Sequence, residues 1–144
     1  MHCLRCGICC IETEMLLSKK DIERLEKKGY ISTFFVRFDN KGYARLRNQR
    51  GHCVFYDPKK KDCRVRSYRP SGCRIYPVIY DEAKGIIIDT ICPSHKTVTK
   101  KQKARRGKRV LQLLKIIDAE AEQRRQVRLG LKHKGNRYSN DNAG

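Results

Sequence analysis

The cysteines constrain this chain more than any other feature of its sequence. It has 144 residues and eight cysteines, and four of the eight lie within the first ten residues, in the pattern Cys-x2-Cys-x2-Cys-Cys. Thiols at this spacing can converge on one point if the loop is tight, and Gly7 permits such a loop. Thiolates are soft ligands that select zinc, copper(I) or iron–sulfur clusters over magnesium or calcium. We therefore predict a metal centre whose ligands are all eight thiols: Cys3, Cys6, Cys9, Cys10, Cys53, Cys63, Cys73 and Cys92.

The spacing of the cysteines leaves two kinds of centre open. Structural zinc sites usually take their ligands in Cys-x2-Cys pairs from two separate loops, whereas the later cysteines here are spaced ten, ten and nineteen residues apart. Consecutive thiols at x2 spacing are more typical of the run that holds a 4Fe–4S cluster, in which a fourth Cys is commonly followed by Pro, as in Cys92-Pro93. The sequence therefore favours an iron–sulfur cluster, with zinc as the close alternative. Eight thiolates would also suffice for two four-coordinate sites.

The composition explains why a metal would matter for folding. Hydrophobic residues make up 39% of the chain, charged residues 34%, and there is no tryptophan. Apolar burial therefore has little material, and bound metal can supply folding free energy. The longest aliphatic run, Ile86-Ile87-Ile88, is far shorter than the roughly 20 residues of a membrane span. We also expect no secretory signal, a cytoplasmic location, and reduced thiols in place of disulfides.

The residue pattern predicts an α+β fold: a small metal-stabilised, cysteine-rich domain over residues 1–95 with short β-hairpins. Ser18 and Asp21 form a capping box ahead of a short helix. The aromatic and β-branched segment 30–38 favours a strand whose hairpin partner is 43–47. Two further hairpins are expected, one joining 53–57 to 63–65 and one joining 78–80 to 85–89, with Cys73 on a strand or a turn.

The C-terminal third is strongly basic. The whole chain carries a formal net charge of +19, and residues 96–137 contain 15 basic side chains against three acidic ones. An apolar stripe at helical spacing runs through the same segment: Val110, Leu114, Ile117 and Ala121. The pattern predicts a long amphipathic helix over about 103–131.

This helix divides the chain into predicted units and suggests a partner. We assign 96–132 as a basic amphipathic helix and 133–144 as a disordered tail. The apolar stripe is expected to dock on the cysteine domain, which leaves the basic face of 100–132 for RNA or DNA phosphates. A membrane surface is the weaker alternative, because the helix lacks the Trp and Phe of many membrane-surface helices. A solvated face without a ligand is the third.

Motifs across the first two thirds of the chain resemble those of a known family. Cys-x2-Cys-Gly-x-Cys-Cys, Gly-x-Cys-Val-Phe-x-Asp at 51–57, Arg69-Pro70-x2-Cys73-Arg74-x-Tyr76-Pro77 and Cys92-Pro93 occur in order. They are similar to the motifs of the YkgJ family of CxxCxxCC cysteine-cluster proteins, over residues 3 to about 93. The resemblance implies chelation of zinc or iron. A similar cysteine domain also forms part of flagellin lysine methylases, where it is tied to methyl transfer.

Residues beside the cysteines complete the candidates. Arg69 and Arg74 flank Cys73 and are predicted to bind the cofactor, by donating to thiolates or by holding an anionic substrate; alternatively they only offset thiolate charge. His52 and His95 are expected near the metal rather than bonded to it. We predict a metal-binding protein with a structural or redox role and assign no catalytic residue. The alternatives are a nucleic-acid- or ribosome-associated zinc module and a component of a methyl-transfer enzyme.

Overall fold

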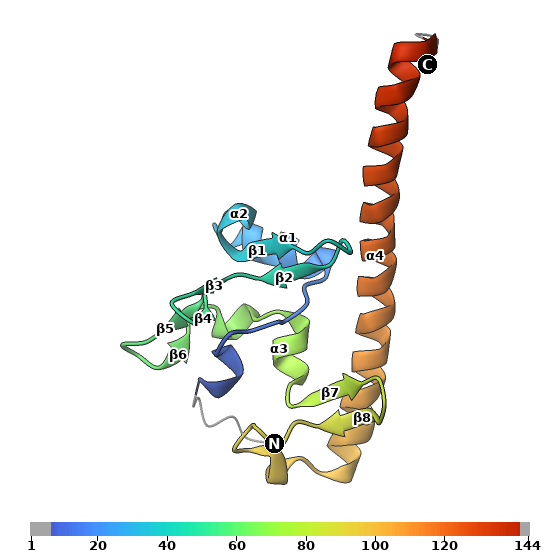
Figure 1. Ribbon diagram of the computed structural model, residues 1–144. Helices are drawn as coiled ribbons and strands as arrows, with labels where there is room; N and C mark the ends of the chain where they lie inside the picture. Colours follow the sequence, from blue (N-terminus) through green and yellow to red (C-terminus); the bar gives the residue numbers. More distant parts are fainter. Residues whose placement is uncertain (1–6, 142–144) are drawn as a thin grey trace.

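The computed structural model describes the backbone of residues 7–141 and the side chains of residues 7–130. This part of the chain contains four two-stranded antiparallel sheets together with helices, so the predicted α+β class is confirmed. Figure 1 shows the short elements gathered into a body that packs along one long helix. Within the described residues, no helix has the combination of length and hydropathy needed to cross a bilayer.

The first helix, α1 (Lys19–Lys27), begins where the sequence predicts. The Ser18 hydroxyl accepts a hydrogen bond from the Asp21 amide, and the Asp21 carboxylate accepts one from the Ser18 amide, both at 3.1 Å. These two bonds complete the predicted capping box. Asp21 and Leu25 are buried on the inner face of the helix, so the cap also anchors α1 to the body.

The strand predicted over 30–38 is wrong in its first half. Helix α2 (Ser32–Phe35) occupies that part, and only β1 (Val36–Phe38) is extended. Phe35 is fully buried, with its ring centroid 5.5 Å from that of Phe55. Tertiary packing of this aromatic pair therefore overrides the local preference for a strand.

Three short hairpins follow in sequence. β1 pairs with β2 (Ala44–Leu46), which confirms the predicted pairing of these segments. The strand predicted over 53–57 is instead divided between two sheets: β3 (Asn48–Gln49) pairs with β4 (His52–Cys53), and β5 (Tyr56–Asp57) pairs with β6 (Asp62–Cys63). Val54 and Phe55 lie between them and are buried. Their burial in the core interrupts the strand.

Cys73 lies on a helix, α3 (Ser71–Ile75), and not on the predicted strand or turn. The Asp21 carboxylate accepts hydrogen bonds from the amide and the hydroxyl of Ser71, both at 3.0 Å. A carboxylate of α1 therefore fixes the start of α3. The next hairpin, β7 (Val78–Asp81) with β8 (Gly85–Ile88), forms as predicted. Short 3-10 helices complete the body: η1 (Ile8–Cys10), η2 (Arg66–Tyr68) and η3 (His95–Thr97).

The main apolar core adjoins several of the cysteines. Its largest fully buried side chains are Phe35, Phe55, Leu17, Leu25 and Leu46. Cys53 belongs to this cluster, and three further cysteines pack against it: Cys10, Cys63 and Cys73. The core and the thiols therefore share one region of the body.

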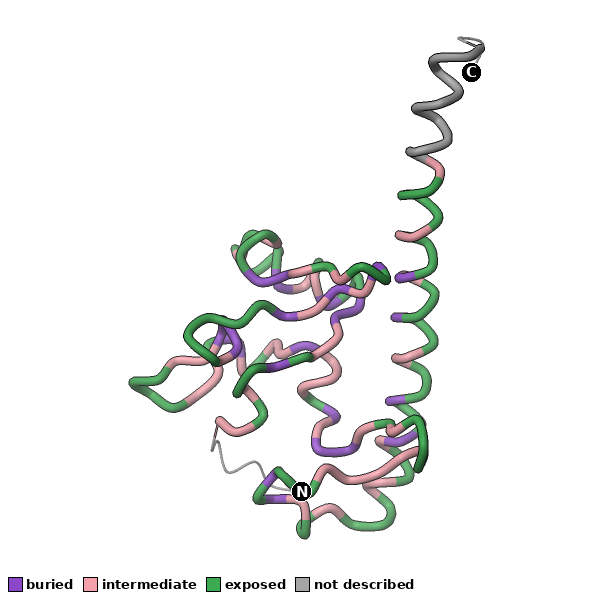
Figure 2. The backbone as a smooth tube through the Cα atoms, in the orientation of Figure 1, coloured by how far each residue is buried: buried purple, intermediate pink, exposed green. Residues whose placement is uncertain are grey.

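The long helix α4 (Lys100–Asp141) begins slightly before the predicted residue 103. Its helical backbone continues to Asp141, through most of the segment 133–144 that the sequence predicts as a disordered tail. Val110, Ile117 and Ala121 of the predicted stripe are buried, and Figure 2 shows buried positions recurring along the side of α4 that faces the body. The apolar stripe of α4 therefore docks on the body, as predicted.

Two glycines allow close approach to α4. A Cβ on Gly107 would lie 2.9 Å from Cγ2 of Ile86 in β8, so the Ile86 side chain packs directly against the helix backbone there. Gly42, in the turn between β1 and β2, has φ +87°, and a Cβ on it would lie 2.7 Å from the carbonyl oxygen of Ala121. Only glycine fits that turn without displacing the helix.

Two arginines of α4 also donate hydrogen bonds to the turn between β1 and β2. Arg124 Nη1 donates to the carbonyl oxygen of Gly42 at 3.0 Å, and Arg125 Nη1 donates to that of Lys41 at 2.7 Å. These side chains engage protein carbonyls, and part of the basic charge predicted to face nucleic acid is therefore used in docking the helix.

Candidate metal centre

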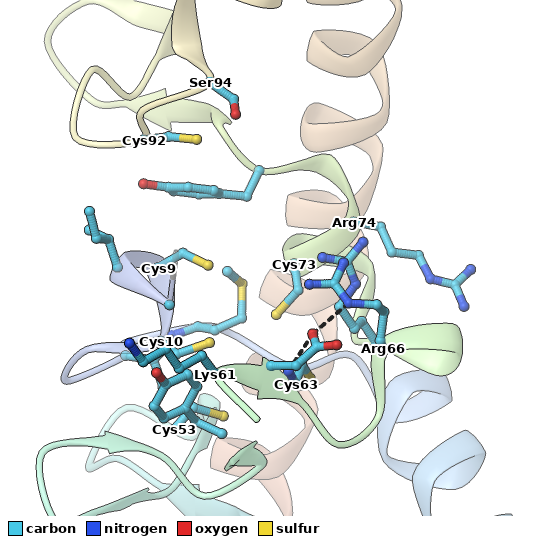
Figure 3. Close-up of a pocket in the computed structure, with 18 of the residues that line it drawn as sticks. Cys9, Cys10, Cys53, Lys61, Cys63, Arg66, Cys73, Arg74, Cys92 and Ser94 are labelled. Atoms are coloured by element: carbon cyan, nitrogen blue, oxygen red, sulfur yellow. Dashed lines mark hydrogen bonds and ion pairs between the residues drawn. The ribbon is translucent and has the colours of Figure 1, made fainter. Parts of the chain in front are cut away.

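Six cysteines of the described chain line one pocket (Figure 3). Cys9 and Cys10 come from η1, Cys53 ends β4, Cys63 ends β6, Cys73 lies in α3, and Cys92 precedes η3. All six are free thiols. The cavity between them has a volume of about 210 Å³. The remaining predicted ligands, Cys3 and Cys6, lie outside the described residues.

Gly7 positions the first thiols of the pocket. It precedes η1 with φ +77°, and a Cβ on it would lie 2.9 Å from Cε2 of Tyr56 in β5. The N-terminal loop therefore presses against the β5–β6 hairpin, which carries Cys63. The tight loop expected at this glycine is present, and it brings Cys9 and Cys10 to the thiols of later elements.

The Cys9 and Cys10 thiols are coupled by a hydrogen bond. Donation from Cys10 lowers the pKa of Cys9 to about 6; burial opposes this shift, and the charges of Arg69 and Arg66 reinforce it. The same hydrogen bond, together with burial, raises the pKa of Cys10. The lowered pKa gives Cys9 thiolate character near neutral pH, and the thiolate is the form that binds metal.

Three further thiols are held in the protonated form by their surroundings. Burial raises the pKa of Cys53 to about 11 and raises those of Cys63 and Cys73 as well. The charges of neighbouring thiols add to the shifts at Cys53 and Cys73. A metal ion that binds these thiols must displace their protons, so uptake of metal would release protons and depend on pH.

The six thiols are not equivalent in position. Figure 3 shows Cys9, Cys10, Cys53, Cys63 and Cys73 together at one side of the pocket, which we call the inner group, whereas Cys92 lies apart, near Ser94. Cys9 and Cys92 both raise the pKa of the Tyr76 phenol, after the larger effects of burial and of its hydrogen bond to Asp89. Tyr76 is therefore close to both Cys92 and the inner group.

The thiols line a cavity and do not already surround a single ion. Among the side chains of residues 7–130, no group of three or more His, Cys, Asp or Glu is arranged to hold a metal ion. The donor set nevertheless fits a thiolate-ligated metal group, because the sulfurs are soft donors and cationic side chains beside them offset thiolate charge. The residues that would hold such a group are the inner thiols and Cys92.

The two predicted arginines both line the pocket but differ in their surroundings. Arg69 is half-buried, and its Nε is buried without a hydrogen-bond partner. Arg74 is exposed, and its Nη2 donates to the carbonyl oxygen of Ser67 at 3.1 Å. Arg69 is therefore the better candidate for contact with a ligand inside the pocket.

Two further arginines line the pocket, Arg66 of η2 and Arg106 of α4, and the sequence analysis missed both. Asp62 accepts a hydrogen bond from Arg66 Nε at 2.6 Å. Arg106 belongs to a helix predicted as a separate unit, so no local pattern would place it beside the cysteines. Its neighbour Gly107, which is unusual inside a helix, was the available signal of close packing.

The two histidines have other contacts. His52 stacks on Tyr56 with ring centroids 4.7 Å apart, and His95 Nδ1 lies 2.8 Å from the carbonyl oxygen of Cys92. Among the described residues that line the pocket, neither histidine occurs. His52 therefore lies beside Tyr56 of β5, and His95 lies beside the backbone of Cys92.

A comparison with protein families identifies the family of this chain. Residues 2–106 match the model of the CxxCxxCC family, described as "Putative zinc- or iron-chelating domain". The chain belongs to this family. The resemblance to YkgJ proteins is thereby confirmed, since that name denotes members of the same family. The matched segment contains all eight cysteines and extends past the predicted boundary at 95 to Arg106 on α4.

One curated relative is itself without an assigned function. Uncharacterized protein MJ0661 of Methanocaldococcus jannaschii is 35% identical over 83 residues, which cover 53% of this chain and 43% of that protein. The chain therefore spans less than half the length of this relative. No solved structure matches the chain. Family membership supports metal ions, zinc or iron, as partners of the cysteines.

Proposed function

We propose that the thiol pocket holds iron in an iron–sulfur cluster, with zinc as the alternative metal. The observation that carries this proposal is the convergence of six thiols on one cavity, from segments as far apart in sequence as η1 and the loop before η3. Membership of a zinc- or iron-chelating family supports the choice of metals. The inner group is the proposed ligand source in the described chain.

Two features favour a cluster over a single ion. The run of thiols at x2 spacing near the N-terminus is typical of 4Fe–4S ligation. The described thiols also line a cavity of about 210 Å³. Four thiolates around one zinc each lie about 2.3 Å from the ion and leave no such space between them.

The proposed centre has a structural role in the first place. Strands β4 and β6 have two residues each and α3 has five, so these elements contribute little stability by themselves. A metal group bound to Cys53, Cys63 and Cys73 would link all three to η1. A redox role would be added to this one if the centre changes oxidation state while the fold persists.

The first experiment is anaerobic purification, followed by analysis of iron, zinc and acid-labile sulfide and by a visible spectrum. A brown protein with near-equal iron and sulfide would support the cluster. Zinc without sulfide in a colourless protein would replace the cluster by the zinc alternative. A protein that contains neither metal and takes up neither on reconstitution would contradict metal binding altogether.

Substitutions then test the ligand assignment. Cys73→Ser is expected to lower the metal content of the purified protein, because it removes an inner thiol that also packs against the core. Ser67→Ala, at an exposed position of η2 near the pocket, is the matched control and is expected to retain the metal. Equal metal content in the two variants would remove Cys73 from the ligand set.

We propose nucleic-acid binding by the first turns of α4 as a second function. Residues 100–117 include eight basic and no acidic side chains. Six of the basic side chains are exposed: Lys100, Lys101, Arg105, Lys108, Arg109 and Lys115. Residues 100–130 contain no aromatic side chain on which a base would stack. The expected interaction is therefore with phosphates and independent of sequence.

Charge reversal with a matched control tests this second function. The first variant changes Lys101, Arg105, Lys108 and Arg109 to Glu, and the control makes the same change at Lys20, Lys27, Lys59 and Lys60, which are exposed elsewhere. Affinity for a short RNA duplex is measured at two salt concentrations. Loss of binding in the first variant alone would support the α4 surface. An equal loss in both would assign the binding to net charge, and salt-independent binding would contradict phosphate contacts.

A further inference from the structure

The thiol pocket has a strongly basic wall. Six charged side chains line it, and five of them are basic: Lys61, Arg66, Arg69, Arg74 and Arg106, with Asp62 as the acidic one. Thiolate charge accounts for part of this excess. The positions of two of the arginines point to a more specific role.

Arg69 has a buried donor without an acceptor. Its Nε is shielded from solvent and makes no hydrogen bond. A buried donor without a partner destabilises the folded chain, so an acceptor atom bound in the pocket would remove that penalty. Carboxylates of the region are engaged elsewhere, Asp62 with Arg66 at 2.6 Å and Asp21 with Arg24 at 2.7 Å.

Arg106 is brought to the same wall by close packing. The contact of Gly107 with Ile86 sets α4 against β8, and the preceding residue, Arg106, lines the pocket. Burial lowers the pKa of this guanidinium, and the charges of Arg109, Arg105 and Arg69 lower it further. Arg69, which follows η2, and Arg106 of α4 therefore line the same pocket, and their positive charges repel each other there.

We propose that Arg69 and Arg106 bind the oxygens of a small anion, an inorganic oxyanion or a carboxylate, at the basic wall of the thiol pocket. The anion would accept the hydrogen bond that Arg69 Nε lacks and would offset the repulsion between the two guanidinium groups. It would lie beside the proposed metal centre, so its place next to a metal rests on the proposed function, whereas the anion site itself rests on the arginines.

Titration of the metal-loaded full-length protein with inorganic phosphate and with acetate, at constant ionic strength and followed by calorimetry, tests the site. Saturable binding of either anion supports the proposal, and the preferred anion identifies the oxyanion or the carboxylate as the ligand chemistry. Arg106→Gln is expected to weaken binding about tenfold or more, because it removes a charge-assisted hydrogen bond. Arg69→Gln is expected to act in the same direction.

Arg109→Gln is the matched control, because it removes the same charge from an exposed position three residues further along α4. Equal weakening by Arg109→Gln and Arg106→Gln would overturn the proposal in favour of a general effect of charge. Absence of saturable binding to the wild-type protein would also overturn it. Metal analysis of each sample separates the two ideas: anion binding without metal would refute only the metal centre, and metal without anion binding only the anion site.

Discussion

Arg124 donates a hydrogen bond from Nη1 to the carbonyl oxygen of Gly42 at 3.0 Å, across 82 residues of chain. The bond lies where the β1–β2 turn comes closest to α4. The Tyr43 hydroxyl donates to Asp118 at 2.6 Å in the same contact. The turn and the helix are therefore joined by polar bonds around a glycine that allows their approach.

Gly42→Ala is expected to weaken this contact measurably. The added Cβ would meet the Ala121 carbonyl oxygen at 2.7 Å, and the residue would also hold an unfavourable φ of +87°. Gly85→Ala is the matched control, because Gly85 has φ +80° but nothing within 4 Å of an added Cβ. In urea unfolding, Gly42→Ala should lose at least about 1 kcal/mol more than Gly85→Ala. Equal losses would mean that α4 shifts away from the turn without a further loss of unfolding free energy.

Asp21→Ala is expected to destabilise the protein by about 3 kcal/mol, because it removes a buried carboxylate that serves several donors. That carboxylate is fully buried and accepts from the Ser18 amide, from Arg24 and from both polar groups of Ser71. Glu23→Ala, at an exposed position of the same helix, should stay within about 0.5 kcal/mol of the wild type. Because Ser71 begins α3, the variant should also lower the metal content of the protein if Cys73 is a ligand as proposed. Unchanged metal retention would show that α3 keeps its position without the hydrogen bonds to Asp21.

Stability at alkaline pH should depend on Tyr43. Its hydrogen bond to Asp118 raises the pKa of the phenol, with burial acting in the same direction. A folded-state pKa above the unfolded value of about 10 gives stability that is present below pH ~10 and is lost as the pH rises through the folded pKa. Tyr43→Phe and Asp118→Asn should therefore both flatten the fall in unfolding free energy above pH ~10. A fall as steep as in the wild type would show that the bond does not persist in solution.

The elements that the sequence predicts well are those fixed by nearby residues. Ser18 and Asp21 mark the start of α1 within one turn, and the stripe through Val110 and Ile117 shows one face of α4. Helix α2 could not be predicted in this way, because its aromatic residues favour a strand locally and become helical only when Phe35 packs on Phe55. Contacts between distant segments decide such cases.

The sequence likewise predicts one part of the candidate site and not the other. Residue type alone singles out the cysteines, and all six in the described chain line the pocket. The role of Arg106 depends on the approach of α4 to β8 at Gly107, which joins positions distant in sequence. The contrast between Arg69, with its unpartnered Nε, and Arg74, which bonds Ser67, likewise exists only in the folded chain.

Removal of the metal is expected to lower the melting temperature by about 10 °C or more, equivalent to a few kcal/mol for a chain of this size. The reason is that the inner thiols would no longer link η1, β4, β6 and α3. Differential scanning calorimetry before and after chelation, and again after the metal is restored, measures the change. An unchanged melting temperature would show that the apolar core around Phe55 suffices.

The helical repeat of α4 fixes the directions in which two of its arginines point relative to each other. Arg106 at the thiol pocket and Arg124 at the β1–β2 turn are 18 positions apart on one helix, which is five turns of about 3.6 residues and about 27 Å. Both side chains therefore leave the helix in nearly the same direction. One residue inserted between them would rotate the second by about 100°. The helix could then engage the pocket or the turn, but not both, so the spacing of these two arginines is as fixed as that of the cysteines.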